Sequence, residues 1–228
     1  MIDELLPDGV VAEEAFDDPD DAKLFPEEQE VIARAVEKRR REFTTVRACA
    51  RAAMARIGQP PVPLLPGERG APHWPAGVVG SMTHCLGYRA AAVGQSTEVQ
   101  AIGIDSEPHE PLPDGVLSHV ALPAEIAQLE SFGNGLHWDR LLFCAKESTY
   151  KAWFPMTRRW LGFEDAEITI DPAGTFTTRL LVPGSRDNGR PLTGFEGRWL
   201  VRDGLVLTAI TVRPDEWPTK RWSALRPN

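Results

Sequence analysis

Helix and strand patterns follow one another in the same order twice along the chain. Apolar residues recur at helical spacing between Ile32 and Ile57, and Pro26 stands where a helix would start. A second helical pattern covers residues 136–154, and Pro155 is expected to end it. Each helical pattern precedes short strand patterns, at residues 78–82, 88–94 and 99–105, and then at 166–171, 175–182, 197–203 and 205–212. The order predicts an α+β fold made of two similar halves, each with a helix packed on a small antiparallel sheet.

The expected halves cover residues 1–110 and 111–228, and residues 1–25 are expected to be irregular. The first helical pattern fits one long helix, or two helices with a break near Arg41. Residues 58–77 are rich in proline and glycine, and so long a loop in a compact chain is often functional. Asp203-Gly204 separates the last two strand patterns and is a typical hairpin turn.

Composition narrows the classes of function. The 228 residues carry a net charge of −8, which argues against general nucleic-acid binding. No apolar run approaches the roughly 18 residues of a membrane helix, and the acidic N-terminus lacks signal-peptide features, so a cytoplasmic protein is expected. The three cysteines form no CxxC pair and are expected to be buried thiols.

Two carboxylates, Asp105 and Glu107, lie one residue apart at the end of a strand pattern. Side chains alternate along a strand, so both are expected on the same face. Two like charges so close favour a cation between them, and Mg²⁺ prefers carboxylate, phosphate and water oxygens. An exposed acidic strand end is nevertheless the more frequent origin of so short a pattern.

Two helical segments add charged groups. Glu147 and Lys151 share a helix face, as a surface ion pair or as a third carboxylate with a lysine for phosphate. Arg40, Arg47 and Arg51 project together from an unbroken first helix at about 3.6 residues per turn, as a solvated face or as a phosphate clamp. The stretch from Ser81 to His84 offers hydroxyl and imidazole groups, although a histidine beside a strand is more often structural.

Together these segments resemble the 4′-phosphopantetheinyl transferases of the surfactin/enterobactin-synthesis class. The family pattern is met by the glycine, isoleucine and two carboxylates of GIDSE, and about forty residues later by FCAKESTYKAWF. The segment SMTHC resembles the serine/threonine-histidine stretch of that family. Longer segments, such as KRRREFTTVR and THCLGYRAAAVG, are most similar to the actinobacterial enzymes that serve polyketide, fatty-acid and peptide synthases.

The resemblance implies an enzyme that moves the phosphopantetheine arm of coenzyme A to a serine of an apo carrier protein. Adenosine 3′,5′-bisphosphate would be the other product, and the active site would lie in a cleft between the halves of a pseudo-dimer. The implied metal ligands for Mg²⁺ are Asp105, Glu107 and Glu147. The implied catalytic residues are Glu147, as a base for the serine, and Lys151, beside the diphosphate. The implied coenzyme A contacts are Arg39, Arg47, Gly67, Arg69, Thr83, His84, Asp105, Lys146, Glu147 and Lys151.

One position departs from the pattern. Close relatives carry a lysine before the glycine of the loop after the first helix, whereas Pro66 precedes Gly67 here. Proline offers neither a charge nor a backbone donor, so Arg69 is expected to compensate. The helical projection favoured Arg40 over Arg39, which leaves open which of the two contacts the nucleotide.

Two other functions remain open: a coenzyme A or nucleotide-binding module without catalysis, and a magnesium-dependent phosphohydrolase. The expected partners are apo acyl or peptidyl carrier proteins, and the expected state is a monomer without membrane association. A docking edge is one interpretation of Arg158, Arg159 and the large apolar residues around them, and burial in the core is the other. Those apolar residues are Trp153, Phe154, Met156 and Trp160.

Overall fold

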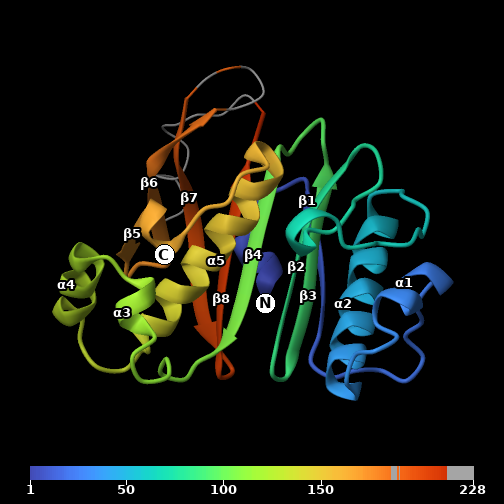
Figure 1. The fold of residues 1–228 in the computed structure, drawn as a ribbon, viewed down its shortest axis with the longest axis horizontal. Coiled ribbons are helices and arrows are strands. Elements are labelled where there is room, and N and C mark those ends of the chain that lie inside the picture. The colour runs from blue at the N-terminus through green and yellow to red at the C-terminus, as the bar shows by residue number, and fades with distance from the viewer. Residues whose placement is uncertain (186–188, 190, 215–228) are drawn as a thin grey trace, which may run out of the picture.

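The computed structural model describes residues 1–185, 189 and 191–214. Two antiparallel sheets stand side by side, each covered by one long helix (Figure 1). The N-terminal sheet has the order β1-β3-β2 and is covered by α2, which spans Glu37–Arg56. Its strands are β1 (Val10–Ala15), β2 (Val78–Cys85) and β3 (Tyr88–Gln95).

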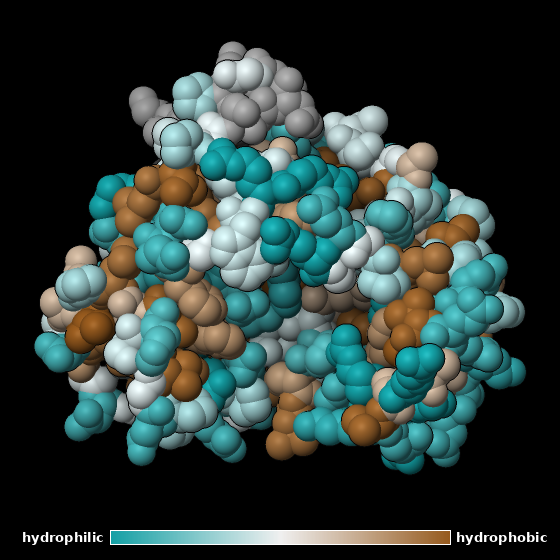
Figure 2. All heavy atoms as spheres, in the orientation of Figure 1, coloured by the Kyte–Doolittle hydropathy of each residue, from teal (hydrophilic) through white to brown (hydrophobic). Residues whose placement is uncertain are grey.

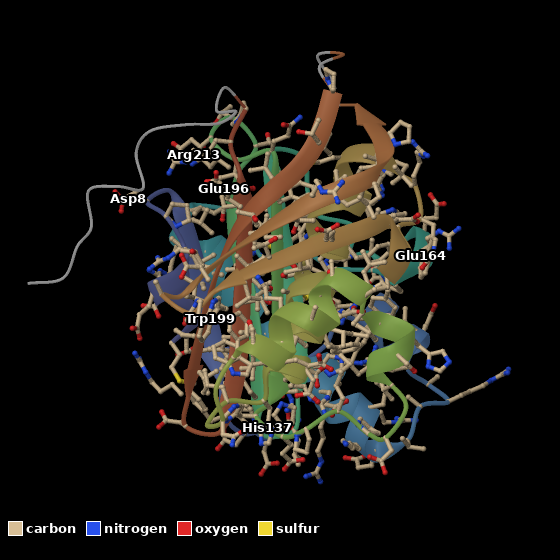
Figure 3. All side chains as sticks on the ribbon, turned by 90° about the vertical axis from the view of Figure 1, so that its left-hand side faces the viewer. Asp8, His137, Glu164, Glu196, Trp199 and Arg213 are labelled. Carbon is tan, nitrogen blue, oxygen red and sulfur yellow. The ribbon has the colours of Figure 1, made fainter. Side chains whose placement is uncertain are left out.

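The C-terminal sheet has the order β4-β8-β7-β6-β5, and α5 (Trp138–Thr157) packs against β4 and β8. Figure 3 views this half with the short helices α3 (Leu117–Val120) and α4 (Pro123–Ser131) in front of the sheet. Its strands are β4 (Ala101–Pro108), β5 (Ala166–Asp171), β6 (Thr175–Ser185), β7 (Pro191–Arg202) and β8 (Leu205–Val212). The remaining elements are α1 (Pro26–Val31) and three short 3-10 helices, at Ile2–Leu5, Glu68–Gly70 and Phe163–Asp165.

Strands β2 and β4 run beside each other at the junction of the two sheets. The backbone N–H of Ile104 donates to the Ser81 hydroxyl at 3.1 Å, and that of Ser106 donates to the Thr83 hydroxyl at 3.0 Å. All four residues are buried. Side-chain oxygens thus satisfy the edge donors of β4 that a neighbouring strand would otherwise satisfy. The two sheets meet here without merging, and the junction becomes the base of the space between the long helices.

The α+β fold is confirmed, and several boundaries differ from those expected. Strand β4 precedes the expected boundary at residue 110 but pairs with β8, because its edge donors toward β2 are taken by hydroxyl groups. The N-terminal 25 residues are not irregular throughout, since β1 pairs with β3. The second half was expected to reach residue 228, and residues 215–228 lie outside the described part of the chain.

Both helices also differ from their expected ends. The first pattern is divided between Val31 and Glu37, earlier than the expected break near Arg41. The second helix continues past Pro155 to Thr157, because a proline near a helix end removes a single backbone donor while Trp153 and Phe154 are held in the core. Among the described residues, no helix has the length and apolar character needed to cross a membrane.

One buried carboxylate occurs at the same place in each half. Glu28 in α1 and Glu125 in α4 both follow a helix-starting proline by two residues, and their exposures are 0% and 1%. Each accepts the N–H of the residue before its helix, and each accepts a distant backbone N–H, from Leu64 and Ile168 respectively. Each is paired with a cation of the long helix behind it.

The Glu125 pair predicts a large loss of stability when it is broken. Lys146 lies 2.8 Å from Glu125 and also donates to the carbonyls of Phe163 and Ala166. Lys146→Met leaves a buried carboxylate without its cation, which should cost about 3–5 kcal/mol in the free energy of unfolding. Chemical denaturation measures this loss. Lys38→Met removes an exposed ammonium that lies 4.0 Å from Glu42, and it should change the free energy of unfolding by less than about 1 kcal/mol. Equal effects of the two substitutions would contradict this account of the buried pair.

Close packing of α5 on β4 gives a second prediction. A Cβ atom added at Gly103 would lie 2.0 Å from the Ser148 carbonyl oxygen. Gly103→Ala should therefore destabilise the protein by about 1–3 kcal/mol, because helix or strand must shift. Gly133→Ala is the matched control, since a Cβ there meets no atom within 4 Å. Thermal unfolding of both variants should show a lower midpoint for Gly103→Ala alone.

Candidate active site

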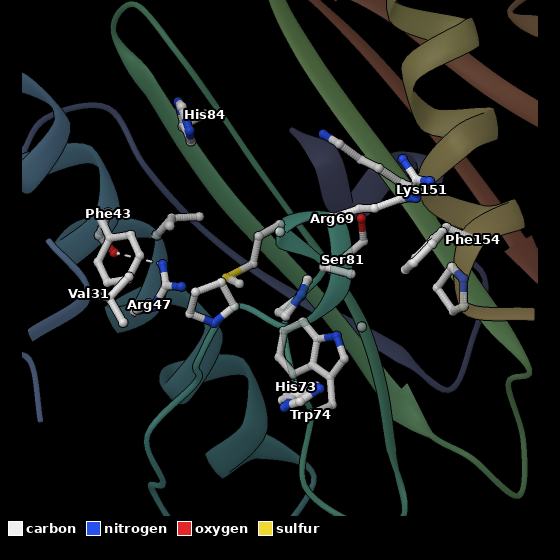
Figure 4. Close-up of a pocket in the computed structure, with 18 of the residues that line it drawn as sticks. Val31, Phe43, Arg47, Arg69, His73, Trp74, Ser81, His84, Lys151 and Phe154 are labelled. Atoms are coloured by element: carbon white, nitrogen blue, oxygen red, sulfur yellow. Dashed lines mark hydrogen bonds between the residues drawn. The ribbon is translucent and has the colours of Figure 1, made fainter. Parts of the chain in front are cut away.

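A cavity of about 690 Å³ lies between the two halves (Figure 4). Phe43 and Arg47 of α2 stand on one side, and Lys151 and Phe154 of α5 stand on the other. Figure 2 shows a hollow in the middle of this face of the molecule. The remaining wall comes from β2 and from the loop before it, and it includes Arg69, His73, Trp74, Ser81 and His84. We call this space the central cavity.

Asp105 and Lys151 form an ion pair beside the central cavity. The ammonium of Lys151 lies 2.7 Å from Asp105 Oδ1 and also donates to the Ile104 carbonyl. Burial opposes the charge of Lys151, but the Asp105 carboxylate outweighs it and raises the pKa of the ammonium. Asp105 Oδ2 is buried and has no hydrogen-bond partner among the described residues. That oxygen can therefore accept a ligand.

The other two carboxylates lie close to Asp105. Glu107 pairs with Arg140 of α5 at 2.9 Å, so Asp105 and Glu107 do face the same helix. Burial raises the pKa of Glu107, and the negative charge of Asp105 raises it further. The same two causes, in the same order, raise the pKa of Glu147. A raised pKa lies closer to neutral pH, which makes the carboxylate a better proton acceptor there.

The donor chemistry of this cluster fits Mg²⁺. The metal ligands would be hard carboxylate oxygens, and one of them, Asp105 Oδ2, has no hydrogen-bond partner among the described residues. The cluster is not preassembled, however. Within the described ranges, no group of three His, Cys, Asp or Glu side chains is arranged to share one ion. Asp105 and Glu107 are held by the protein's own cations, Lys151 and Arg140, whose charges reduce the repulsion between the carboxylates.

Arg39 reaches the central cavity, and Arg40 is turned away from it. Arg39 Nη1 lies 2.6 Å from His84 Nε2, and because arginine can only donate, the imidazole accepts with Nε2. Burial, together with the charge of Arg39, lowers the pKa of His84. Arg40 instead donates to the carbonyls of Ala33 and Ala35. Helical projection could not show this difference, because both arginines lie within α2 and Arg40 turns back to carbonyls that precede the helix.

Arg47 is a buried cation of the cavity wall with an exposure of 5%. Its Nε donates to the Leu64 carbonyl at 2.8 Å, and its guanidinium carbon lies 3.1 Å from the centroid of the Phe43 ring. Burial lowers the pKa of Arg47 to about 10, and the nearby carboxylate of Glu28 acts against this. Arg51 does not join it at the cavity, because it is bound to Glu28 and to the Lys23 carbonyl.

The loop before β2 brings Arg69 to the cavity in place of the expected lysine. Pro66 and Pro72 form an isolated bridge, and the Gly67 N–H donates to the Ala71 carbonyl at 2.7 Å. Arg69 has a positive φ of 55° and lies over the Trp160 ring at 5.3 Å. This contact joins the N-terminal loop to the segment after α5. A Cβ at Gly67 would lie 2.5 Å from the His73 ring, so the imidazole packs directly against this glycine.

Two predicted ligand contacts have structural partners instead. The Thr83 hydroxyl lies 3.2 Å from Asp105 Oδ1 and accepts the Ser106 N–H, so it holds β4 beside β2. Lys146 has an exposure of 3%, and its three donors are taken by Glu125 and two carbonyls. It still borders a smaller cavity of about 110 Å³ that Glu147 and Tyr150 also line.

The large apolar residues between Trp153 and Trp160 divide between core and surface. Trp153 and Met156 are buried in the C-terminal core, and Phe154 is buried beside the central cavity. Trp160 is 60% exposed, and Arg158 and Arg159 are exposed beside it. The docking-edge interpretation therefore applies to these three residues and not to the other aromatic side chains.

Sequence reasoning missed several groups at the site. Arg140 holds Glu107, and Glu42 lies 3.7 Å from His84 Nδ1. Tyr150 lines both cavities, and its hydroxyl is buried without a hydrogen-bond partner in the described part of the chain. The sequence around a charged or aromatic residue on a long helix does not indicate which distant side chain or cavity that residue will contact. Glu28 could have been found, since its proline-x-glutamate pattern recurs at Glu125.

Comparison with known proteins agrees with the geometry along both halves. Residues 27–94 match the 4′-phosphopantetheinyl transferase N-terminal domain, and residues 101–196 match the 4′-phosphopantetheinyl transferase superfamily. The boundary between the two matches falls between β3 and β4, where the sheets also divide.

Three curated relatives cover most of the chain. The 4′-phosphopantetheinyl transferase Svp of Streptomyces mobaraensis is 59% identical over 93% of this chain and 89% of its own. Npt of Nocardia iowensis is 55% identical over 92% of this chain and 99% of its own. PptT of Mycobacterium tuberculosis is 55% identical over 87% of this chain and 90% of its own. With a cation-lined cavity between two such halves, the chain belongs to the 4′-phosphopantetheinyl transferase superfamily.

Proposed function

We propose that the protein transfers the 4′-phosphopantetheine arm of coenzyme A to a serine of apo acyl or peptidyl carrier proteins. The serine oxygen bonds to the β-phosphorus, the bond from that phosphorus to the bridging oxygen breaks, and adenosine 3′,5′-bisphosphate leaves. Carriers of polyketide, fatty-acid and nonribosomal peptide synthases are the proposed acceptors. Both walls of the central cavity come from one chain, which supports a monomeric enzyme.

The observation that carries the proposal is the charge arrangement of the central cavity. Arg39, Arg47 and His84 lie on its N-terminal side, which suits the phosphates of the nucleotide end. Lys151 lies on the opposite side, against the Asp105 carboxylate. An extended molecule with anionic groups at one end and a diphosphate in its middle matches this order of charges.

Named residues have separate roles in the proposed transfer. Glu147 accepts the serine proton, for which its raised pKa makes it a better base. Lys151 stabilises the negative charge that develops on the diphosphate as the bond breaks. Tyr150 lines both the central cavity and the smaller one, and Arg69 lines the central cavity, so the pantetheine arm would lie beside these two residues.

Asp105, Glu107 and Glu147 would hold Mg²⁺ in this proposal. The ion would supply positive charge to the diphosphate oxygens. Asp105 contributes the unpartnered Oδ2, while Lys151 and Arg140 keep the first two carboxylates in place before ligands arrive.

Mass spectrometry of an apo carrier protein tests the function directly. Incubation with coenzyme A and Mg²⁺ should add one phosphopantetheine group to the carrier, and chelation of the metal should stop the addition. A binding module would retain coenzyme A without modifying any carrier. A phosphohydrolase would release adenosine 3′,5′-bisphosphate from coenzyme A without a carrier, and either result would contradict the proposal.

Removal of the carboxylate of Asp105 or of Glu147 should abolish most of the transfer activity. Asp105→Ala and Glu147→Ala should each lower the transfer rate by about 100-fold or more, because charge stabilisation and proton transfer are lost. Glu196→Ala, an exposed carboxylate on β7 (Figure 3), is the control and should retain the wild-type rate. Circular dichroism verifies folding, and full activity of both cluster variants would refute the assigned roles.

A further inference from the structure

We infer that Glu28 is a positioning residue for the nucleotide end of coenzyme A, acting through Arg47 and not by touching the ligand. This inference rests on the proposed function, because it assigns Arg47 to the nucleotide. Glu28 belongs to α1, is fully buried, and does not line the central cavity, whereas Arg47 does.

The backbone of a single residue, Leu64, connects Glu28 and Arg47. Glu28 Oε1 accepts the N–H of Leu64 at 2.8 Å, and the carbonyl of the same residue accepts Arg47 Nε at 2.8 Å. Glu28 thereby fixes the position of the carbonyl that orients the guanidinium. The carboxylate is also 3.7 Å from Arg47 Nε, so it provides the counter-charge of a cation with an exposure of only 5%.

One nitrogen of the Arg47 guanidinium, Nη2, is left to bind a ligand. Its Nε is used by Leu64, and its Nη1 donates to the Phe43 carbonyl at 3.4 Å (Figure 4). Phe43 also covers one face of the guanidinium at 3.1 Å. Nη2 has no partner among the described residues and belongs to a side chain of the cavity wall. A fixed, charged donor of this kind suits a phosphate oxygen.

Arg51 completes the support on the side away from the cavity. Its Nη1 contacts both Glu28 oxygens, at 2.9 and 3.1 Å, and its Nη2 donates to the Lys23 carbonyl. Glu28 is therefore shared by two arginines, of which Arg47 alone lines the central cavity. The matching carboxylate of the other half, Glu125, supports a lysine whose donors are all used within the protein.

Glu28→Gln in the full-length enzyme tests the inference, because glutamine keeps the shape and removes the charge. Calorimetric titration with adenosine 3′,5′-bisphosphate should show affinity reduced about tenfold, as for one weakened charge-assisted contact. The KM for coenzyme A should rise by a similar factor, with kcat within about twofold of wild type. Should Glu28→Gln fail to fold, Glu28→Asp retains the charge at a shorter reach and should weaken binding likewise.

Two controls separate positioning from general destabilisation. Glu125→Gln removes the equivalent charge from the other half, and it should lower the unfolding temperature without weakening adenosine 3′,5′-bisphosphate binding. In an Arg47→Met background, Glu28→Gln should cause no further loss of affinity, since the residue acts through Arg47.

The outcomes distinguish this inference from the proposed function. Wild-type affinity for adenosine 3′,5′-bisphosphate in Glu28→Gln, or equal losses in Glu28→Gln and Glu125→Gln, would overturn the inference while transfer activity still supports the function. An additional tenfold loss in the Arg47→Met background would also overturn it. Failure of the wild-type enzyme to modify any carrier would contradict the proposed function itself.

Discussion

The junction between β2 and β4 determines where a site can form in this fold. Hydroxyl groups of Ser81 and Thr83 satisfy the backbone donors at the facing edge of β4, so the two sheets remain separate. Each sheet then carries its own long helix, and the helices stand apart over the junction. Because Thr83 also lies 3.2 Å from Asp105, the residue that joins the sheets contacts the acidic cluster directly.

Charge compensation makes that cluster compatible with burial. Lys151 and Arg140, both on α5, hold Asp105 and Glu107, and the remaining carboxylate of Glu147 is one helix turn from Lys151. The helix therefore supplies both the counter-charges and the third acid. The consequence is a site in which two carboxylates are held by ion pairs without a ligand, while one oxygen of Asp105 has no hydrogen-bond partner among the described residues.

Sequence patterns predicted the fold class and the facing of the acidic pair. Period-two alternation placed Asp105 and Glu107 on one face, and both contact α5. The same patterns could not show that β4 changes sheets, because strand periodicity does not specify the neighbouring strand. The family resemblance implied ligand contacts for Thr83 and Lys146, and periodicity could not show that their polar groups also bind distant buried segments. The choice between Arg39 and Arg40 could not be made from the sequence, because both lie in α2 and the structure alone shows Arg40 turned back to the carbonyls of Ala33 and Ala35.

The same proline-x-glutamate element begins a short helix in both halves of the protein. Glu28 and Glu125 are 97 residues apart by their numbers, and both begin a short helix that precedes a helix of 20 residues. Identity between the halves is not apparent in the sequence, yet this element has the same bonds in both. Burial of an ionised group leaves little freedom to change it, so each half can vary at its surface while this carboxylate continues to fix how a short helix is anchored to a long one.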